Sequence, residues 1–364
     1  MDNINTQDIL QKLEEVISKT ENKDFNMYFF VIDTKNAPDG SVEYMYDIAL
    51  NLFNKGYQVT MLHQEEEFIG PVDWLGERYS VLEHKNVEKD NVPISTTDFL
   101  FIPESCVSVM TQTKNIKCKK IMLYHTPEYF LKLMPMGLTL GDLGINNVIV
   151  PNQELANKVK SYFPRVTTNI IRPSVKKCFF TNTEPKKLIV NIMGSDESDI
   201  NNILKPFFWK YPAYKWVSFR DMHGMTQKVY AEVLREGAIT VWSDDKTVCG
   251  QTALEALKCG SILIAKVPNM IPEWMIENGE LRNDIIWFEN YDELHRILAS
   301  VIRGWTRNDI VEDFSNVNTK INNIYTPEAQ DKDIDNVVVD TIVRDRLNEY
   351  RQMLSGIKTK NVEE

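Results

Sequence analysis

A stretch in the second half of the chain, residues 247–273, has the residue types of an anion-binding site. Gly250 and Thr252 open a run with apolar residues at helical spacing, and Gly260 is placed to end that helix. The first N–H groups of a helix lack partners and lie at its positive end, so they attract phosphates. Glu255, about one turn inside, could accept hydrogen bonds from two sugar hydroxyls, so a nucleotide diphosphate fits the stretch. The alternative is an ordinary helix–strand unit with Glu255 as a solvated surface acid.

The composition is typical of a soluble globular chain with two domains. Hydrophobic residues make up 43% and charged residues 26% of the 364 positions. The net charge of −11 disfavours a broad nucleic-acid-binding surface, although a local basic cleft stays possible. Five cysteines without a CxxC pair, and five scattered histidines, argue against a disulfide framework and a metal site. We expect a cytoplasmic protein with no signal peptide and no membrane span.

Apolar runs alternate with helical patterns along most of the chain. Continuous apolar runs predict buried parallel strands in two series, separated by a polar hinge at residues 174–186. The predicted strands are 27–32, 57–62, 99–102, 119–124, 147–150 and 168–171 in the first series, and 187–193, 215–219, 238–242, 261–265 and 285–288 in the second. We therefore predict an α/β fold with two Rossmann-like doubly wound domains that face a cleft.

The ends of the chain are predicted to be helical. Apolar residues recur at helical spacing in residues 9–17, so a leading helix should pack on the domain behind it. A longer helix is expected from residue 333 and should lie across one or both domains. The expected boundaries are 1–172 for the N-terminal domain, 173–332 for the C-terminal domain, and 333–364 for the crossover helix and tail.

Polar residues that follow predicted strands are further candidates, because open α/β sheets bind ligands at the carboxyl ends of their strands. His125 directly follows a strand and could orient a hydroxyl or hold a developing charge, or else pack at the strand end. Gly194 ends the first strand of the second series. Arg172 at the hinge and Arg220 after the 215–219 strand could meet a diphosphate, although Arg220 fits a surface loop equally well.

The order of these parts resembles the retaining family 4 glycosyltransferases of the GT-B fold, over about residues 27–310. The segment richest in matching features is TVCGQTALEALKCGSILIAKVPNMIPE, which is similar to the E-x7-E region of that family. The other segments that carry the resemblance are PDGSVEYMYDIALNLFNKGYQVTML, KIMLYHTPEYF, NNVIVPNQELANKV and NIIRPSVKKCFF.

The resemblance implies a nucleotide sugar, UDP- or GDP-linked, bound by the C-terminal domain, and an acceptor on the N-terminal side. Glu255 would match the glutamate that holds the nucleotide ribose, His125 the histidine near the donor sugar and acceptor, and Gly40 the loop glycine near the diphosphate. The backbone N–H groups offered to the donor phosphate or sugar would come from Gly250, Gln251 and Thr252.

Two departures from the family pattern bear on the chemistry. The position of the first glutamate of E-x7-E is occupied by Thr247. Thr247 is therefore a candidate catalytic residue, although it has no carboxylate. The arginine and lysine of the family after the first strand of the C-terminal domain are missing from residues 194–200 (GSDESDI). Another base, such as Arg172, Arg220 or Lys266, would have to replace them.

The predicted function is hexosyl or pentosyl transfer from a nucleotide sugar to an unidentified glycan, lipid, protein or nucleic-acid base. Retention of configuration is expected, with no metal ion or further cofactor, and Asp244 and Asp245 are a weak metal candidate. Cleft closure, acceptor placement and stabilisation of the departing diphosphate would drive the reaction. The alternatives are a phage-type DNA-base glycosyltransferase, a non-catalytic GT-B-like binding protein and, more remotely, a sugar-phosphate epimerase.

Overall fold

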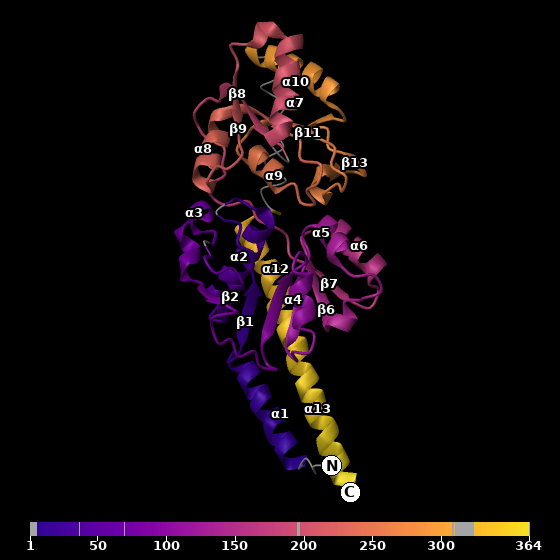
Figure 1. The fold of residues 1–364 in the computed structure, drawn as a ribbon. Helices are drawn as coiled ribbons and strands as arrows, with labels where there is room; N and C mark the ends of the chain where they lie inside the picture. The colour runs from indigo at the N-terminus through magenta and orange to yellow at the C-terminus, as the bar shows by residue number, and fades with distance from the viewer. Residues whose placement is uncertain are drawn as a thin grey trace.

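The computed structural model describes residues 6–35, 37–68, 70–194, 197–307, 309 and 324–363. Two α/β lobes are stacked end to end, and two helices extend from the lower lobe (Figure 1). The predicted α/β architecture with two parallel sheets is confirmed.

The N-terminal domain is built on a seven-stranded parallel sheet with the order β3-β2-β1-β4-β5-β6-β7. The order reverses between β1 and β4, which makes this point the topological switch of the sheet. The strands are β1 (Asn26–Phe30), β2 (Gln58–His63), β3 (Glu83–Asn86), β4 (Phe99–Pro103), β5 (Lys119–Leu123), β6 (Ile145–Val150) and β7 (Thr167–Ile170). The main helices are α2 (Gly40–Asn54), α3 (Val72–Leu75), α4 (Val107–Gln112), α5 (Pro127–Leu133) and α6 (Gln153–Tyr162).

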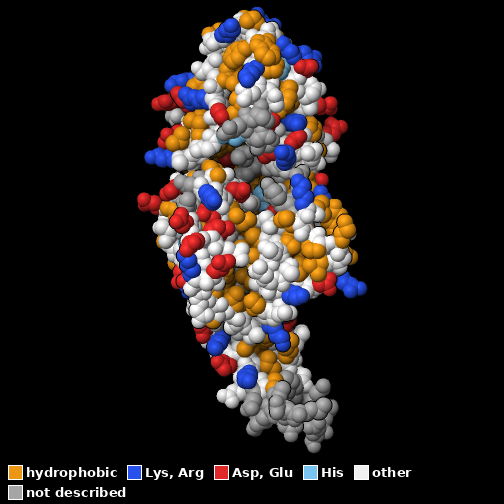
Figure 2. Space-filling view, in the orientation of Figure 1, with side chains coloured by type: hydrophobic (Ala, Val, Ile, Leu, Met, Phe, Trp, Pro, Cys, Tyr) orange, Lys and Arg blue, Asp and Glu red, His pale blue; other side chains and the backbone are white. Residues whose placement is uncertain are grey.

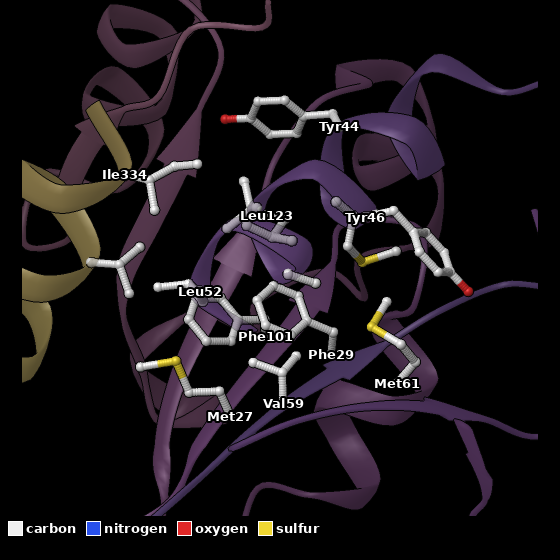
Figure 3. Packing of buried hydrophobic residues seen from close by; sticks show 14 of the residues in the cluster. Met27, Phe29, Tyr44, Tyr46, Leu52, Val59, Met61, Phe101, Leu123 and Ile334 are labelled. Carbon is white, nitrogen blue, oxygen red and sulfur yellow. The ribbon is translucent and has the colours of Figure 1, made fainter. Parts of the chain in front are cut away.

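The core of this domain lies between the sheet and its covering helices (Figure 3). Phe29 on β1 stacks on Phe101 on β4, with ring centroids 4.3 Å apart. Ile334, from the C-terminal part of the chain, points into the same cluster (Figure 3). Burial on both faces explains why β1 and β4 read as continuous apolar runs. The short strand β3 (EHKN) was not predicted, because a polar strand at the sheet edge has no such run.

The C-terminal domain contains a five-stranded parallel sheet with the order β14-β11-β10-β8-β9. Its strands are β8 (Lys187–Met193), β9 (Ser218–Asp221), β10 (Gly237–Trp242), β11 (Ile262–Lys266) and β14 (Ile286–Phe288), and β12 (Ile276–Glu277) and β13 (Glu280–Leu281) form a separate hairpin. Its helices are α7 (Glu197–Lys210), α8 (Gln227–Glu236), α9 (Gln251–Lys258) and α10 (Tyr291–Thr306). The strand predicted at 215–219 starts later, at Ser218, because Pro212–Tyr214 form a 3-10 helix before it.

The C-terminal segment returns to the N-terminal domain. It consists of α12 (Pro327–Ile334), a π-helix (Asp335–Val343) and α13 (Arg344–Glu363), and its buried residues join the core of that domain. The leading helix α1 (Thr6–Glu21) packs along α13, with Arg351 paired to Glu21 at 2.6 Å, and the two termini lie at the tip of this extension (Figure 1). In the described part of the chain, no helix is long and apolar enough to cross a membrane.

Candidate functional site

A cleft of about 530 Å³ lies between the two domains, at the waist of the molecule (Figure 2). Loops after β1 and β5 line it from the N-terminal domain, and loops after β8, β9 and β10 line it from the C-terminal domain, so strand ends of both sheets meet there. The predicted site residues that line it are Gly40, His125, Gly194, Thr247, Gln251, Thr252 and Glu255. Ser195 and Asp196, which follow Gly194, lie outside the described residues.

The N-terminus of α9 opens into the cleft without a side-chain cap. Gly250 precedes the helix with φ +59°, and a Cβ there would lie 2.8 Å from Met275 Cε and 3.0 Å from Trp274 Cζ2. Glycine is therefore required by the turn itself. Thr247 Oγ1 accepts a hydrogen bond from Gly250 N–H at 3.3 Å, so this hydroxyl supports the loop before the helix. The arrangement leaves N–H groups at the positive end of α9 directed to the cleft.

Glu255 is buried at the back of the cleft, with 4% of its surface exposed. Gln251 Nε2 donates a hydrogen bond to its Oε1 at 3.3 Å. Burial raises the pKa of the Glu255 carboxyl well above its ordinary value, and the nearby Glu43 carboxylate raises it further. The alternative of a solvated surface acid is therefore wrong.

His125 lies two residues beyond the end of β5 and faces the other domain. Its Nε2 lies 3.6 Å from Cys249 Sγ, and its ring centroid is 5.7 Å from that of Tyr44. Burial lowers the pKa of the imidazole below its usual 6.5, so the ring is neutral at neutral pH. A neutral imidazole can accept a proton at one nitrogen and donate a hydrogen bond from the other.

The loop that carries His125 is held by Glu104, at the edge of β4. This side chain is 3% exposed, and its carboxylate accepts a hydrogen bond from Thr126 N–H at 2.5 Å. Burial raises the pKa of Glu104 from 4.5 to about 7. Glu104 therefore links the protonation state of a buried carboxyl to the backbone next to His125.

We expect Glu104 to make the protein less stable as pH rises. The pKa of Glu104 is higher in the folded state than in the unfolded state. Its contribution to the free energy of unfolding is therefore fully present below pH 4.5 and is lost as pH rises through about 7. At about 1.4 kcal/mol per pKa unit, the free energy of unfolding should fall by about 2 to 3 kcal/mol between about pH 5 and pH 8 on this account. Urea titrations should show that Glu104→Gln removes this part of the pH dependence and that Glu88→Gln, on the surface, retains it. Equal pH dependence in wild type and Glu104→Gln would contradict this assignment.

Gly40 and Asp39 shape the N-terminal side of the cleft. The Asp39 carboxylate caps α2, accepting hydrogen bonds from Ser41 N–H at 2.9 Å and Val42 N–H at 3.0 Å. These N–H groups are thus occupied by an acidic side chain. A Cβ at Gly40 would meet nothing within 4 Å, so the glycine leaves open space beside the cap.

The predicted arginines do not line the cleft. Arg172 donates to Asp333 on α12 at 3.0 Å, and Arg220 pairs with Glu236 at 2.5 Å. Lys266 pairs with Asp245 at 2.6 Å, whereas Asp244 lines the cleft. Among the described residues, Lys246 is the only lysine or arginine that lines it. Among the described residues, the positive charge along the cleft therefore comes from Lys246 and the N-terminus of α9.

Several residues that line the cleft or lie next to it were not predicted. Glu43 on α2 is 8% exposed and accepts a hydrogen bond from Gln227 Nε2, on α8 of the other domain, at 2.8 Å. Lys176 in the predicted hinge is 5% exposed, and its Nζ lies 3.5 Å from Glu43 Oε1 and also contacts Asp47. The sequence around each of these residues does not indicate its contacts, because the partners are far apart in the chain.

Contacts across the junction hold the two domains together beside the cleft. Asn152 Nδ2 donates to Val248 O at 2.6 Å, and Gln153 N–H donates to Glu273 at 3.2 Å. Within the described residues, no group of three His, Cys, Asp or Glu side chains is placed to hold a metal ion.

The chain matches no family model and no curated protein in sequence. In structure, it is similar to HepE (Alr3699) of Anabaena in complex with UDP-glucose, with a TM-score of 0.59, 11% identity, and coverage of 86% of this chain and 99% of that one. It is also similar to a sucrose-phosphate synthase from Thermosynechococcus elongatus (TM-score 0.58, 10% identity, 91% and 100% coverage). A third similar structure is the pneumococcal O-GlcNAc transferase GtfA in complex with UDP and GlcNAc (TM-score 0.56, 9% identity, 92% and 99% coverage). These likenesses extend over both domains.

Proposed function

From the GT-B fold, which the chain shares with these three proteins, we propose that it is a glycosyltransferase that uses a nucleotide-sugar donor. The observation that carries the proposal is the buried Glu255 carboxyl beside the uncapped N-terminus of α9, both in one interdomain cleft. A carboxyl group accepts hydrogen bonds from sugar hydroxyls, and the helix N-terminus attracts a diphosphate. A nucleotide sugar contains both groups.

In this proposal, each side of the cleft has a distinct role. Glu255 binds the ribose, and the first N–H groups of α9, at Gln251 and Thr252, bind the diphosphate together with Lys246. His125 lies on the opposite wall, where it would contact the donor sugar and the acceptor hydroxyl. The cleft excludes water and places the hydroxyl near the anomeric carbon, which lowers the barrier to transfer.

The proposed reaction needs no metal ion and retains the configuration of the sugar. Lys246 and the positive end of α9 would stabilise the diphosphate as it departs, in place of a divalent cation. Turnover that EDTA does not change would support metal independence. An NMR spectrum in which the product linkage has the anomeric configuration of the donor would support retention. UDP-linked donors come first in the test, because the HepE and GtfA structures hold UDP-glucose and UDP.

The proposal is tested by a panel of UDP-, GDP- and ADP-linked sugars. We expect at least one to raise the melting temperature of the protein by several degrees and to be hydrolysed slowly when no acceptor is present. The panel should be read by thermal shift and by release of the nucleoside diphosphate. If no compound binds, the glycosyltransferase proposal is wrong.

The second candidate is a GT-B protein that binds nucleotide sugars without transferring them. Thr247 stands where a carboxylate was expected, and Lys246 is the only described lysine or arginine in the cleft, so the catalytic groups are few. Binding in the panel without hydrolysis or transfer would favour this candidate. Salt-dependent binding of duplex DNA would instead favour a DNA-base acceptor, against the acidic Asp39, Glu43 and Asp244 in the cleft.

A further inference from the structure

The back of the cleft holds two buried carboxyl groups that come from different domains. Glu43 extends from the first turn of α2, and Glu255 extends from α9. They are 8% and 4% exposed, and both line the same cavity. An amide from the C-terminal domain orients each one: Gln227 Nε2 donates to Glu43 Oε1 at 2.8 Å, and Gln251 Nε2 donates to Glu255 Oε1 at 3.3 Å.

The charges around this pair do not balance. Lys176 Nζ lies 3.5 Å from Glu43 and also contacts Asp47, so this cation is shared with a third carboxylate. Arg78 lies 3.7 Å from Asp47. Burial raises the pKa values of both Glu43 and Glu255, and the Glu43 carboxylate adds to the rise at Glu255. A buried carboxyl pair of this kind retains protons and needs hydrogen-bond partners that carry no negative charge.

The distance of the carboxyl pair from the N-terminus of α9 indicates which group of a ligand the pair could bind. Glu255 lies four residues into α9 after Gln251, which places it about 6 Å along the helix from the N–H groups that face a diphosphate. In a nucleoside diphosphate, the ribose hydroxyls lie at about this distance from the phosphates. The neighbouring wall is aromatic, with Phe179 and Tyr230 in edge contact at 5.9 Å, which suits the apolar face of a sugar ring.

We propose that Glu43 and Glu255 form one diol-binding subsite, in which the N-terminal domain contributes Glu43 to hold the ribose of the nucleotide. This inference rests on the proposed function and adds a specificity-determining residue to it. Glu43 supplies a second carboxyl group to a site where the Thr247 position has none. The ribose then contacts both domains, so the nucleotide holds the cleft closed.

Calorimetric titration with UDP, 2′-deoxy-UDP and 3′-deoxy-UDP tests the subsite, together with the corresponding GDP set. Wild type should bind the ribonucleotide at least about tenfold more tightly than one of its deoxy forms, because that form leaves a buried carboxyl group without its hydroxyl partner. In Glu43→Gln, the ratio of ribonucleotide to deoxynucleotide affinity should shrink to within about threefold, because the amide has a single acceptor oxygen, and Gln227 already donates to that position. Glu88→Gln is the control, since Glu88 is an exposed glutamate of the N-terminal domain that does not line the cleft; its affinity ratio should equal that of wild type.

A second variant keeps the test decisive if Glu43→Gln does not fold. Gln227→Ala removes the hydrogen bond that orients Glu43 and should also reduce the ratio, while thermal melts report whether the variant is folded. Ratios in the folded variants that equal the wild-type ratio would overturn the subsite and leave the proposed function intact. Absence of any nucleotide binding by wild type would overturn both.

Discussion

Replacing Glu255 with alanine is expected to lower kcat/KM for donor hydrolysis by about 100-fold, mainly through a higher KM. The carboxyl lies at the back of the cleft and is oriented by Gln251, so it is placed to accept hydrogen bonds from donor hydroxyls. Each hydrogen bond to a neutral carboxyl contributes about 0.5 to 1.5 kcal/mol, and two such bonds, at most about 3 kcal/mol together, account for a loss of about 100-fold. Because the ribose does not change during transfer, these bonds are the same in the ground state and the transition state, so kcat should change less than KM.

The Glu255→Ala protein should remain folded. Glu255 has a raised pKa because burial penalises its charge, so its removal relieves a desolvation cost and leaves a small cavity. A melting temperature within a few degrees of wild type would separate lost binding from lost structure. Glu232→Ala is the matched control, because Glu232 is an exposed glutamate on the helix α8 of the same domain. Equal turnover by wild type and Glu255→Ala would remove the role assigned to this residue.

The sequence predicts the fold well where one physical rule dominates. Strands such as β1 and β10 are buried on both faces, so each has an unbroken run of apolar residues. Such a run identifies a buried parallel strand. The edge strand β3 has no such constraint, and β9 was displaced by the 3-10 helix that begins at Pro212. A regular alternation of strands and helices also restricts the topology to right-handed crossovers, which is why the interdomain cleft could be expected.

The candidate site could be predicted in part for a related reason. His125, Gly194 and Glu255 follow from their places at strand ends or just inside a helix, and the fold brings such positions together. The partners of long charged side chains do not follow from sequence position. Arg172 meets Asp333, 161 residues away, and so does not line the cleft.

The same limit applies to Glu43 and Lys176, which were not predicted at all. Glu43 lies among the buried residues of α2, and Lys176 lies in a segment that composition alone identifies only as a polar hinge. Their contact joins positions 133 residues apart, as the numbering shows (176 − 43 = 133). Only tertiary structure brings a hinge lysine, two carboxylates of α2 and a glutamine of α8 into one buried network.

Replacing His125 with alanine is expected to lower kcat for transfer by about 100- to 1000-fold and to change nucleotide affinity by less than about threefold. The imidazole faces the cleft from the N-terminal domain, while the proposed nucleotide-binding groups belong mainly to the C-terminal domain and the back of the cleft. His125 should therefore act on the sugar and acceptor during transfer rather than on the nucleotide before it. Single-turnover kinetics and calorimetry with the donor identified in the panel measure the two effects separately.

The pH profile and a neighbouring variant distinguish this role from a structural one. Because burial lowers the pKa of His125, the neutral ring persists below pH 6.5, and wild-type kcat should fall only at lower pH, as the ring becomes protonated. Cys249→Ala is the control, since it removes the partner 3.6 Å from His125 Nε2 and leaves the ring in place. It should retain kcat within a few-fold of wild type. If His125→Ala weakened nucleotide binding more than it slowed transfer, His125 would be a structural residue at the domain junction.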